Sequence, residues 1–491
     1  MEGEDDIPTP LINDDGEDDT TPAFIDMSSA VEVTVSPEED VEPMEDDDED
    51  DEELPTEAQD TTVEAPKEDV SKCTMSTHTD AIYAITSHYD PASSSFTIVS
   101  GGGDDTAYIH TLSSSYIPTS TKLSHAHTDS VSAVALNAPY VGNAGGGKVS
   151  PKLIGVGSYD GAIVLYNQET GEKVQVLEGP SDVECLCFHP KGGTVLLAGS
   201  IADGTVWMYH TPTSKCLQVF VGHEAGVTAC SFTPDGKFAL SASQDGTLRV
   251  WAPKTGLSRH VFRFNDTEAA ALTCMGINGG VDGQLVICGS ENGAAYVAHV
   301  GKKKVVATLR HAEVTPTGAG GMDVDGEEEV LTSSVEAVAF APSAVNTNWC
   351  ATGGMDGLLK IWDLTTCQCR QICSPKHNTT MEDATAPAEE EKTNDGGEGT
   401  GITRLQWHPT LPLIFTSSPD GAIRLYDVRN GQLVHSLSGH IDMINDMDIQ
   451  FIMPENGVGG GKAMVVTASD DKCVKVFEVD VDMVLAQSQQ Q

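Results

Sequence analysis

The chain has 491 residues and a formal net charge of −48 at pH 7, from 75 acidic and 27 basic side chains. A field of this sign repels the phosphates of nucleic acids and the anionic surface of membranes, so we expect neither as a direct partner. The sequence shows no secretory signal at its start and no stretch of roughly 20 apolar residues that would span a membrane. These properties predict a cytoplasmic protein, with the nucleus as a second compartment, and favour a basic polypeptide as its partner.

Residues 1–69 form an acidic segment. Residues 1–70 hold 29 acidic side chains against the single Lys67, and nine acids follow one another from Glu45 to Glu53. A segment of this composition buries too little apolar surface to offset the entropy that is lost on ordering. We therefore expect residues 1–69 to be a disordered tail and residues 70–491 to form the folded domain.

From residue 72 onward one pattern recurs eight times. An apolar strand is followed by a strand that ends in small residues, then by Asp-Gly or a variant of it, and then by a strand that mostly ends in an aromatic residue. The shorter distances between copies match the about 40–45 residues of a four-stranded propeller blade. The turn and third-strand segments are residues 104–110, 160–166, 203–209, 245–251, 292–298, 356–362, 420–426 and 471–477. The pattern predicts an all-β, eight-bladed β-propeller.

Insertions of two kinds lengthen some of the repeats. Residues 142–152 and 453–462 are rich in glycine and fall between the first and second strands of a repeat. Residues 312–333 and 376–400 are acidic and fall between the last strand of one repeat and the first strand of the next. Loops between repeats share a rim with the Asp turns, conventionally called the top face. We therefore expect the acidic insertions on the top face and the glycine-rich ones below.

The fourth repeat carries four polar residues at fixed positions. His223 precedes the first strand, Ser241 ends the second, Asp245 makes the turn and Trp251 closes the third. This set resembles the hydrogen-bonded tetrad of WD repeats, in which Asp accepts from the imidazole and the hydroxyl meets both the imidazole and the indole N–H. The same geometry is expected for His78, Ser100 and Asp104, and for His440, Thr467 and Asp471. We interpret these histidines as structural residues and not as catalytic bases.

The eighth repeat lacks a convincing fourth strand, because only residues 480–491, with a polar Gln/Ser end, follow its third strand. Residues 70–75 read as a short strand without a repeat of their own. We expect them to complete the last blade, which closes the ring and hides the sheet edges that an open stack would expose.

No motif in the chain points to catalysis or to a bound metal or cofactor. Residues 142–149 nearly match the phosphate loop GxxxxGK[ST], but Val149 replaces the hydroxyl residue that holds magnesium, and no helix pattern follows. Cys367, Cys369 and Cys373 form a CxCxxxC run without a second pair at zinc-finger spacing, so we favour buried thiols on a strand. We expect all 12 cysteines to be free. The sequence predicts a protein that is not an enzyme.

The resemblance to WD repeats implies three contact positions for a docked peptide in each blade. Two flank the first apolar residue of the first strand, and the third precedes the turn Asp. Five of these 24 positions are acidic and none is basic, which favours a basic ligand, although an acidic rim that is merely solvated is the alternative. The candidate binding residues are Asp182, Glu184, Glu291, Glu336 and Asp470, with Tyr83, Tyr159, Met355 and Met443.

A narrower likeness lies in residues 102–105, 196–209 and 471–477. These segments resemble the angio-associated migratory cell protein family, which also has an acidic N-terminal region before eight WD repeats, so the resemblance covers essentially the whole chain. The family includes fungal chaperones that hold a basic segment of a large-subunit ribosomal protein, and animal members linked to cell migration. His110, Ala252 and Ala298 depart from the WD pattern.

Two functional hypotheses follow. The resemblance implies a monomeric chaperone in ribosome biogenesis that captures a Lys/Arg-rich segment on the top face. The alternative is a general protein-interaction scaffold, in signalling and cell migration or in a ubiquitin ligase, whose binding does not depend on charge. The acidic tail would either compete for the top face or only keep the protein soluble.

Overall fold

The computed structural model describes residues 68–491 apart from residues 114, 138–151, 193, 265–269, 280–283, 312–332, 376–400, 455–458 and 489–491. The expected disorder of the tail and the expected positions of the four insertions therefore concern residues that lie largely outside the described ones. Among the described residues, no helix has the length and apolar character required to cross a membrane. All twelve cysteines are free thiols.

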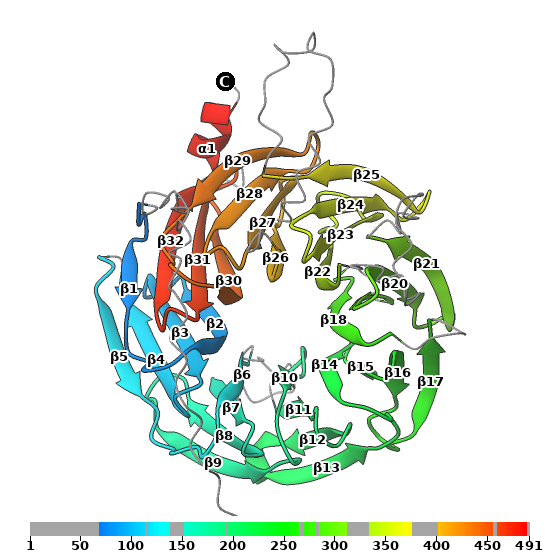
Figure 1. The fold of residues 1–491 in the computed structure, drawn as a ribbon. Coiled ribbons are helices and arrows are strands. Elements are labelled where there is room, and N and C mark those ends of the chain that lie inside the picture. Colours follow the sequence, from blue (N-terminus) through cyan, green and yellow to red (C-terminus); the bar gives the residue numbers. More distant parts are fainter. Residues whose placement is uncertain are drawn as a thin grey trace, which may run out of the picture. The chain divides into compact units, whose positions relative to one another are not determined.

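Eight antiparallel sheets of four strands each stand around a common axis, which confirms the predicted eight-bladed propeller (Figure 1). Blades 1 to 7 each use four consecutive strands, the first innermost and the fourth at the outer rim. Blade 1 contains β2 (Ile82–Asp90), β3 (Ser95–Gly102), β4 (Ala107–Leu112) and β5 (Pro118–Lys122). Blade 2 contains β6 (Val131–Leu136), β7 (Leu153–Ser158), β8 (Ala162–Asn167) and β9 (Lys173–Glu178). Blade 3 contains β10 (Cys185–Phe188), β11 (Val195–Gly199), β12 (Val206–His210) and β13 (Lys215–Phe220), with the 3-10 helix η2 (Thr211–Thr213) before β13.

The other blades repeat this arrangement. Blade 4 contains β14 (Val227–Phe232), β15 (Ala239–Ser243), β16 (Thr247–Trp251) and β17 (Ser258–Arg263). Blade 5 contains β18 (Leu272–Ile277), β19 (Leu285–Ser290), β20 (Ala294–His299) and β21 (Lys304–Arg310). Blade 6 contains β22 (Val335–Phe340), β23 (Trp349–Gly354), β24 (Leu359–Asp363) and β25 (Gln368–Cys373). Blade 7 contains β26 (Arg404–Trp407), β27 (Leu413–Ser417), β28 (Ile423–Asp427) and β29 (Gln432–Leu437).

Blade 8 joins the two ends of the folded chain. It contains β30 (Ile444–Ile452), β31 (Lys462–Ser469) and β32 (Val474–Asp480), and its fourth strand is β1 (Cys73–Met75). β1 runs antiparallel to β32, with Cys73 opposite Val476 and Met75 opposite Val474. The strand expected within residues 70–75 therefore lies on the edge of the last blade, and blue and red segments meet there in Figure 1.

The position of a strand in its blade decides how it is buried. The second strands β15 and β27 are buried at every residue, because neighbouring blades cover both of their faces. The fourth strand β9 keeps most of its side chains exposed at the outer rim. Continuous apolar strands inside and polar edge strands outside are what these two environments require. The apolar cores lie between blades, as where Leu240 and Leu248 of blade 4 pack with Val286 of blade 5.

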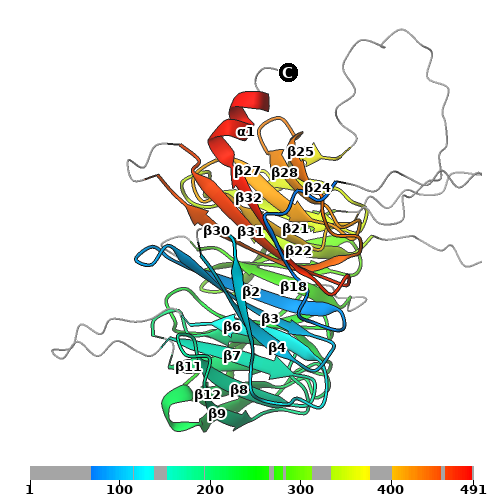
Figure 2. The ribbon, with the colours of Figure 1, turned by 90° about the vertical axis from the view of Figure 1, so that its left-hand side faces the viewer.

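The helix α1 (Val481–Ser488) was not expected, because this stretch reads as a polar end in the sequence. Val481 and Val484 are buried in the core shared by blades 7 and 8, and Asp482 accepts a hydrogen bond from the backbone N–H of Gly460 at 2.7 Å. Figure 2 shows the ring from its side, with α1 beyond the end of β32. The helix thus covers apolar surface that a purely polar tail would leave open.

Candidate functional site

The fourth blade contains the complete tetrad that the sequence predicts. His223 Nδ1 lies 2.9 Å from Asp245 Oδ2, and His223 Nε2 lies 2.7 Å from Ser241 Oγ. The indole N–H of Trp251 donates to the same hydroxyl at 2.8 Å. Burial alone would raise the pKa of Asp245, but the hydrogen bonds from His223 and Thr247 outweigh this effect and hold the pKa well below its usual range. The carboxyl is therefore ionised at neutral pH. The tetrad ties the loop before β14 to the turn before β16.

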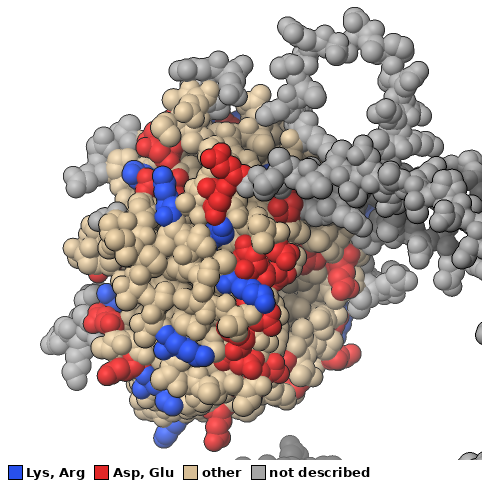
Figure 3. Space-filling model, turned by 60° about the vertical axis from the view of Figure 1, so that its left-hand side comes forward, with Lys and Arg blue, Asp and Glu red and all other residues tan. Residues whose placement is uncertain are grey.

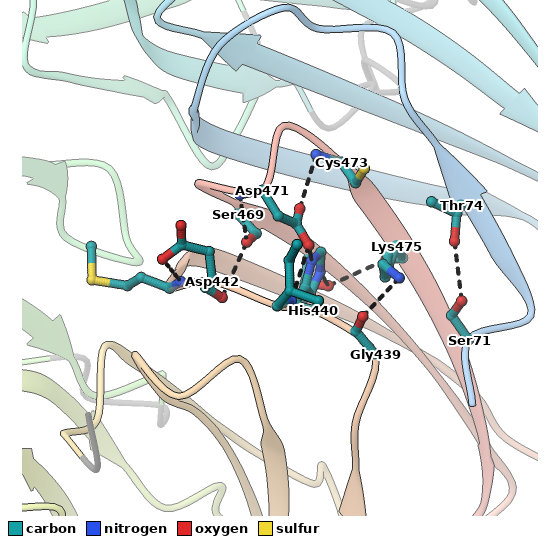
Figure 4. Close-up of polar contacts among 12 residues, drawn as sticks. Ser71, Thr74, Gly439, His440, Asp442, Ser469, Asp471, Cys473 and Lys475 are labelled. Carbon is teal, nitrogen blue, oxygen red and sulfur yellow. Dashed lines mark hydrogen bonds and ion pairs between the residues drawn. The ribbon is translucent and has the colours of Figure 1, made fainter. Parts of the chain in front are cut away.

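Blades 1 and 8 use the same device with changes: blade 1 has a histidine in place of the tryptophan, and blade 8 has Thr467 in place of the serine and Phe477 in place of the tryptophan. His78 bridges Asp104 (2.9 Å) and Ser100 (2.8 Å), and His110 takes the place of the tryptophan with its Nε2 3.0 Å from Ser100 Oγ. Burial lowers the pKa of His110 to about 3, so it stays neutral and fits this position. In blade 8, His440 lies 2.7 Å from Asp471 and 2.8 Å from Thr467. Figure 4 shows His440 and Asp471 of this set.

Blade 6 holds a second tetrad that includes a tryptophan, and it was not predicted from the sequence. His311 Nδ1 lies 2.6 Å from Thr352 Oγ1, His311 Nε2 lies 3.2 Å from Asp356 Oδ1, and Trp362 donates to Thr352 at 2.8 Å. An acidic insertion separates His311 from β22, so the histidine does not stand just before a first strand as the others do. The sequence signal that could have identified it is its position just after the fourth strand of the preceding blade. His311 directly follows β21, and His440 likewise closely follows β29.

Blade 2 carries an incomplete set. His127 Nδ1 lies 3.1 Å from Asp160, but Val156 stands where the hydroxyl residue would be. As a result, His127 Nε2 is buried without a hydrogen-bond partner among the described residues. The loop before β6 is still held to its turn, because Thr128 N–H also donates to Asp160 at 3.0 Å. In five blades, therefore, a histidine and an aspartate fix the loops of the top face.

The nine candidate binding residues differ in how much of their surface is exposed to solvent. Tyr83, Tyr159 and Met355 expose 40%, 38% and 46% of their surface, and Glu291 is also exposed. The half-buried ones are Glu184, Glu336, Asp470 and Met443. Asp182 is only 7% exposed, so the three contact positions in each blade are not equivalent.

The Asp182 side chain forms hydrogen bonds within its own blade. Its carboxylate accepts hydrogen bonds from the Ser200 hydroxyl and, at 3.1 Å, from the Ala202 N–H. Asp470 is partly occupied in the same way, because Asn445 Nδ2 donates to it at 2.6 Å. A buried carboxylate with such partners has little left to offer a ligand, so we leave Asp182 out of the proposed binding surface.

Glu184 lies in a different environment. The Tyr159 hydroxyl donates to Glu184 Oε2 at 2.9 Å, which joins blade 2 to blade 3 at the inner edge of the top face. Burial raises the pKa of Glu184; the hydrogen bond from Tyr159 opposes this, and nearby Asp182 adds to it. A carboxylate whose ionised form is disfavoured by its surroundings gains from a cation placed beside it.

Four further acids belong to this face and were not among the candidates. They lie in the loops before the first strands, one or two residues after a loop histidine, and all are exposed: Asp80, Asp129, Glu224 and Asp442. The three aligned contact positions of each blade do not include this recurrent acid, so it was not predicted from the sequence. In Figure 3 the Asp and Glu side chains gather toward the right-hand side, the rim that faces the viewer in Figure 1.

Two basic side chains on this rim, those of Lys472 and Arg424, are tied to the protein. Lys472 donates to the backbone carbonyl of Thr79 at 3.0 Å, and Arg424 forms an ion pair with Asp420. In the described ranges, no three His, Cys, Asp or Glu side chains are placed to share a metal ion. Within the CxCxxxC run only Cys373 is buried, so the expectation of three buried thiols was wrong: Cys367 lies in an exposed turn and Cys369 on an exposed edge strand.

Comparison with protein families gives two matches. Residues 171–210, 214–252, 329–363 and 431–478 match the family described as WD domain, G-beta repeat. Residues 390–451 match the one described as Anaphase-promoting complex subunit 4 WD40 domain. Three of the first four matches start near a fourth strand and end near the third strand of the next blade, so the sequence repeat is offset from the structural blade.

Two solved structures show the same fold. Saccharomyces cerevisiae Sqt1 has a TM-score of 0.64 at 18% identity, covering 84% of this chain and 99% of its own. Chaetomium thermophilum Sqt1, in a crystal structure bound to the N-terminus of the ribosomal protein L10, has a TM-score of 0.60 at 19% identity, covering 84% of this chain and 100% of its own.

Relatives in sequence are closer. The ribosome biogenesis protein WDR12 homolog of Chlamydomonas reinhardtii is 26% identical over 67% of this chain and 72% of its own length. The angio-associated migratory cell protein of Homo sapiens is 30% identical over 412 residues, which cover 83% of this chain and 80% of that protein, and the Canis lupus familiaris protein matches equally well. The identity, the coverage and the propeller together show that this chain belongs to the angio-associated migratory cell protein family.

Proposed function

We propose that this chain binds a basic segment of a large-subunit ribosomal protein on its top face, as a chaperone in ribosome biogenesis, and that it acts by binding and not by catalysis. One observation carries the proposal: exposed carboxylates recur around this face, one each from five blades. They are Asp80, Asp129, Glu224, Glu291 and Asp442. The Chaetomium thermophilum Sqt1 structure, bound to the N-terminus of ribosomal protein L10, supports a ribosomal client.

The geometry suits an extended basic peptide. The carboxylates would steer the peptide and bind its ammonium and guanidinium groups, while the exposed rings of Tyr83 and Tyr159 and the side chain of Met355 would pack on the aliphatic stems. Because the histidine and aspartate pairs already hold the top loops, most of the ordering entropy falls on the ligand and little on the propeller. Glu184 and Glu336 would add charge at the inner edge of this surface.

Charge reversal tests the proposal. We expect the purified chain to bind the N-terminal peptide of ribosomal protein L10 at low salt and to release it as the salt concentration rises. The double variant Glu291→Lys/Asp442→Lys should weaken binding at least about tenfold, because two attractive contacts become repulsive. Calorimetric titration measures both effects.

The matched control is Glu169→Lys/Glu172→Lys, which also reverses two charges but on the opposite rim, where both side chains are exposed. It should bind like the wild type. Equal binding by all three proteins would contradict the proposal and favour the scaffold alternative, in which charge on the top face is unimportant. We place the activity in the cytoplasm, with the nucleus as a second compartment, and expect a monomer; light scattering of the purified chain checks the latter.

A further inference from the structure

Arg404 is a basic residue in the middle of the proposed acidic surface. It is the first residue of β26, which Figure 1 places between β22 and β30 and across the ring from β10. Its Nε donates to Asp446 Oδ1 of the next blade at 2.9 Å, and its Nη1 to the Thr403 carbonyl at 3.2 Å. Although it starts an innermost strand, 49% of its side chain is exposed.

The corresponding residue of the other blades carries no positive charge. Each lies two residues after the first apolar residue of the innermost strand, and the set comprises Ala84, Ala133, Cys185, Ala229, Cys274, Ala337 and Asp446. Small residues at this level leave the inner rim clear. Arg404 therefore places a guanidinium at a level where the other blades offer an alanine, a cysteine or an acid.

The fold does not need Arg404 to satisfy Asp446. Asp446 Oδ2 accepts the Ile85 N–H at 2.9 Å, and Asp446 Oδ1 accepts the Met447 N–H at 3.0 Å. A half-exposed ion pair adds little to stability, because water screens it and two side chains lose freedom. The pair with Asp446 can thus open without leaving the carboxylate unpartnered.

The charge of Arg404 reaches the carboxylates of the proposed site. It opposes the rise in the pKa of Glu184, which burial and Asp182 cause. The pKa of Arg404 is itself raised, chiefly by Asp446 against the opposing effect of burial, with smaller contributions that include Glu336. The field of this guanidinium therefore extends beyond its partner Asp446.

We propose that Arg404 is a built-in competitor, whose half-exposed guanidinium at the inner rim occupies, beside Asp446, a place that a basic side chain of the ligand would otherwise take. The inference rests on the proposed function, because it names the residue that tunes the same surface. A ligand with one basic side chain gains little binding free energy by displacing Arg404. A segment with several basic residues also binds the exposed carboxylates of the top-face loops, and this additional binding free energy allows it to displace Arg404. Arg404 thereby selects for densely basic segments.

Neutralising Arg404 should tighten binding. The probe is a short fluorescent peptide of alternating arginine and alanine, and the readout is its Kd by fluorescence anisotropy. Arg404→Gln keeps a donor for Asp446 and removes the charge, and we expect a Kd about threefold to tenfold lower at low salt. The gain should shrink at high salt, where the remaining attraction is screened. Arg404→Lys keeps the charge and should bind like the wild type.

Arg429→Gln is the matched control. Arg429 is in the same blade, is paired with Asp427 and is 59% exposed, but it follows β28 at the opposite rim. Removing this charge should leave the Kd unchanged, which separates a local effect from one of net charge. Melting temperatures confirm that the variants are folded.

An unchanged or higher Kd for Arg404→Gln overturns the inference, since a competitor cannot be removed without gain. If the wild type binds the peptide and loses it on charge reversal of the top face, the proposed function survives that result. If the wild type does not bind the peptide at all, both fall.

Discussion

The boundary between blades 8 and 1 and the boundary between blades 4 and 5 hold the same kind of elements together in different ways. At the first, four side chains of β30 bind the open backbone edge of β2: Asn445 to Ile82 O, Asp446 to Ile85 N, Asp448 to Ser87 N and Gln450 to Ser87 O. At the second, one side chain among the described residues does so, as the Thr228 hydroxyl donates to Leu272 O at 2.9 Å. Both boundaries also have an apolar core.

The difference follows from connectivity. Blades 4 and 5 are consecutive, so the chain itself limits how far β18 can slide along β14. Blades 8 and 1 meet through residues about 360 positions apart, as for Ile85 and Asp446. Apolar packing has no direction and tolerates a shift, whereas hydrogen bonds to particular backbone groups do not. The polar contacts thus give the closing boundary a register that chain connection gives between blades 4 and 5.

The closing strand should have the largest effect on stability. Deleting residues 1–76 removes β1, exposes the edge of β32 and takes the side chains of Met75 and Cys73, which are 3% and 8% exposed, out of the core shared by blades 8 and 1. We expect a loss of about 3–5 kcal/mol in the free energy of unfolding, measured by chemical denaturation. The deletion also breaks the partly buried ion pair of Lys475 with Asp69.

Deletion of residues 1–66 is the control, because it spares Glu68 and Asp69, both of which contact blade 8. Its unfolding should match the wild type. If both deletions unfold alike, β1 contributes nothing to the closure, and the four side-chain contacts of β30 alone hold the boundary.

The closing strand was within reach of sequence reasoning, and the polar contacts beside it were not. The eighth repeat lacks a fourth strand, and residues 70–75 form a strand that has no repeat of its own. Each would leave an unpaired strand edge, which is unfavourable, so the two can be expected to pair. Asp446 and Asp448, by contrast, look in the sequence like ordinary alternating polar residues of a strand. Their partners are backbone groups of β2, which carry no sequence signal.

The same limit explains the errors at the candidate site. Asp182 occupies an aligned contact position, but it turns inward because Ser200 and Ala202 present donors to it. His311 was missed because local spacing to β22 is interrupted, although its hydrogen bonds match those of the other tetrads. Repeat alignment predicts where a residue stands in a blade, and not which way a short loop directs its side chain.

Asp448 offers a test in which the closing boundary becomes stronger. Burial raises the pKa of this carboxyl, and the hydrogen bonds from Ser87 only partly oppose it. A raised folded pKa means that the stabilising contribution is fully present below the unfolded pKa of about 3.9 and is lost as the pH rises through the folded value. At pH 7 the ionised group therefore weakens the fold relative to a neutral one.

Asp448→Asn keeps an acceptor for Ser87 and removes this charge. We expect it to raise the free energy of unfolding by about 1 kcal/mol at pH 7, with a difference from the wild type that narrows as the pH falls toward 4. Denaturant titrations at several pH values measure it. Asp448→Ala, which leaves the Ser87 N–H without its acceptor, should instead lose about 1–2 kcal/mol. A difference that grows toward acidic pH would contradict the assignment.

Thr228→Val addresses the other boundary and should have the smallest effect. It removes the side-chain hydrogen bond to Leu272 and keeps the branched shape that suits a strand, so we expect a loss of about 0.5–1 kcal/mol by the same denaturation assay. The Leu272 carbonyl belongs to an innermost strand, where water can replace the lost donor. A loss as large as that of Asp448→Ala would mean that consecutive blades also depend on a fixed register, and that chain connection alone does not supply it.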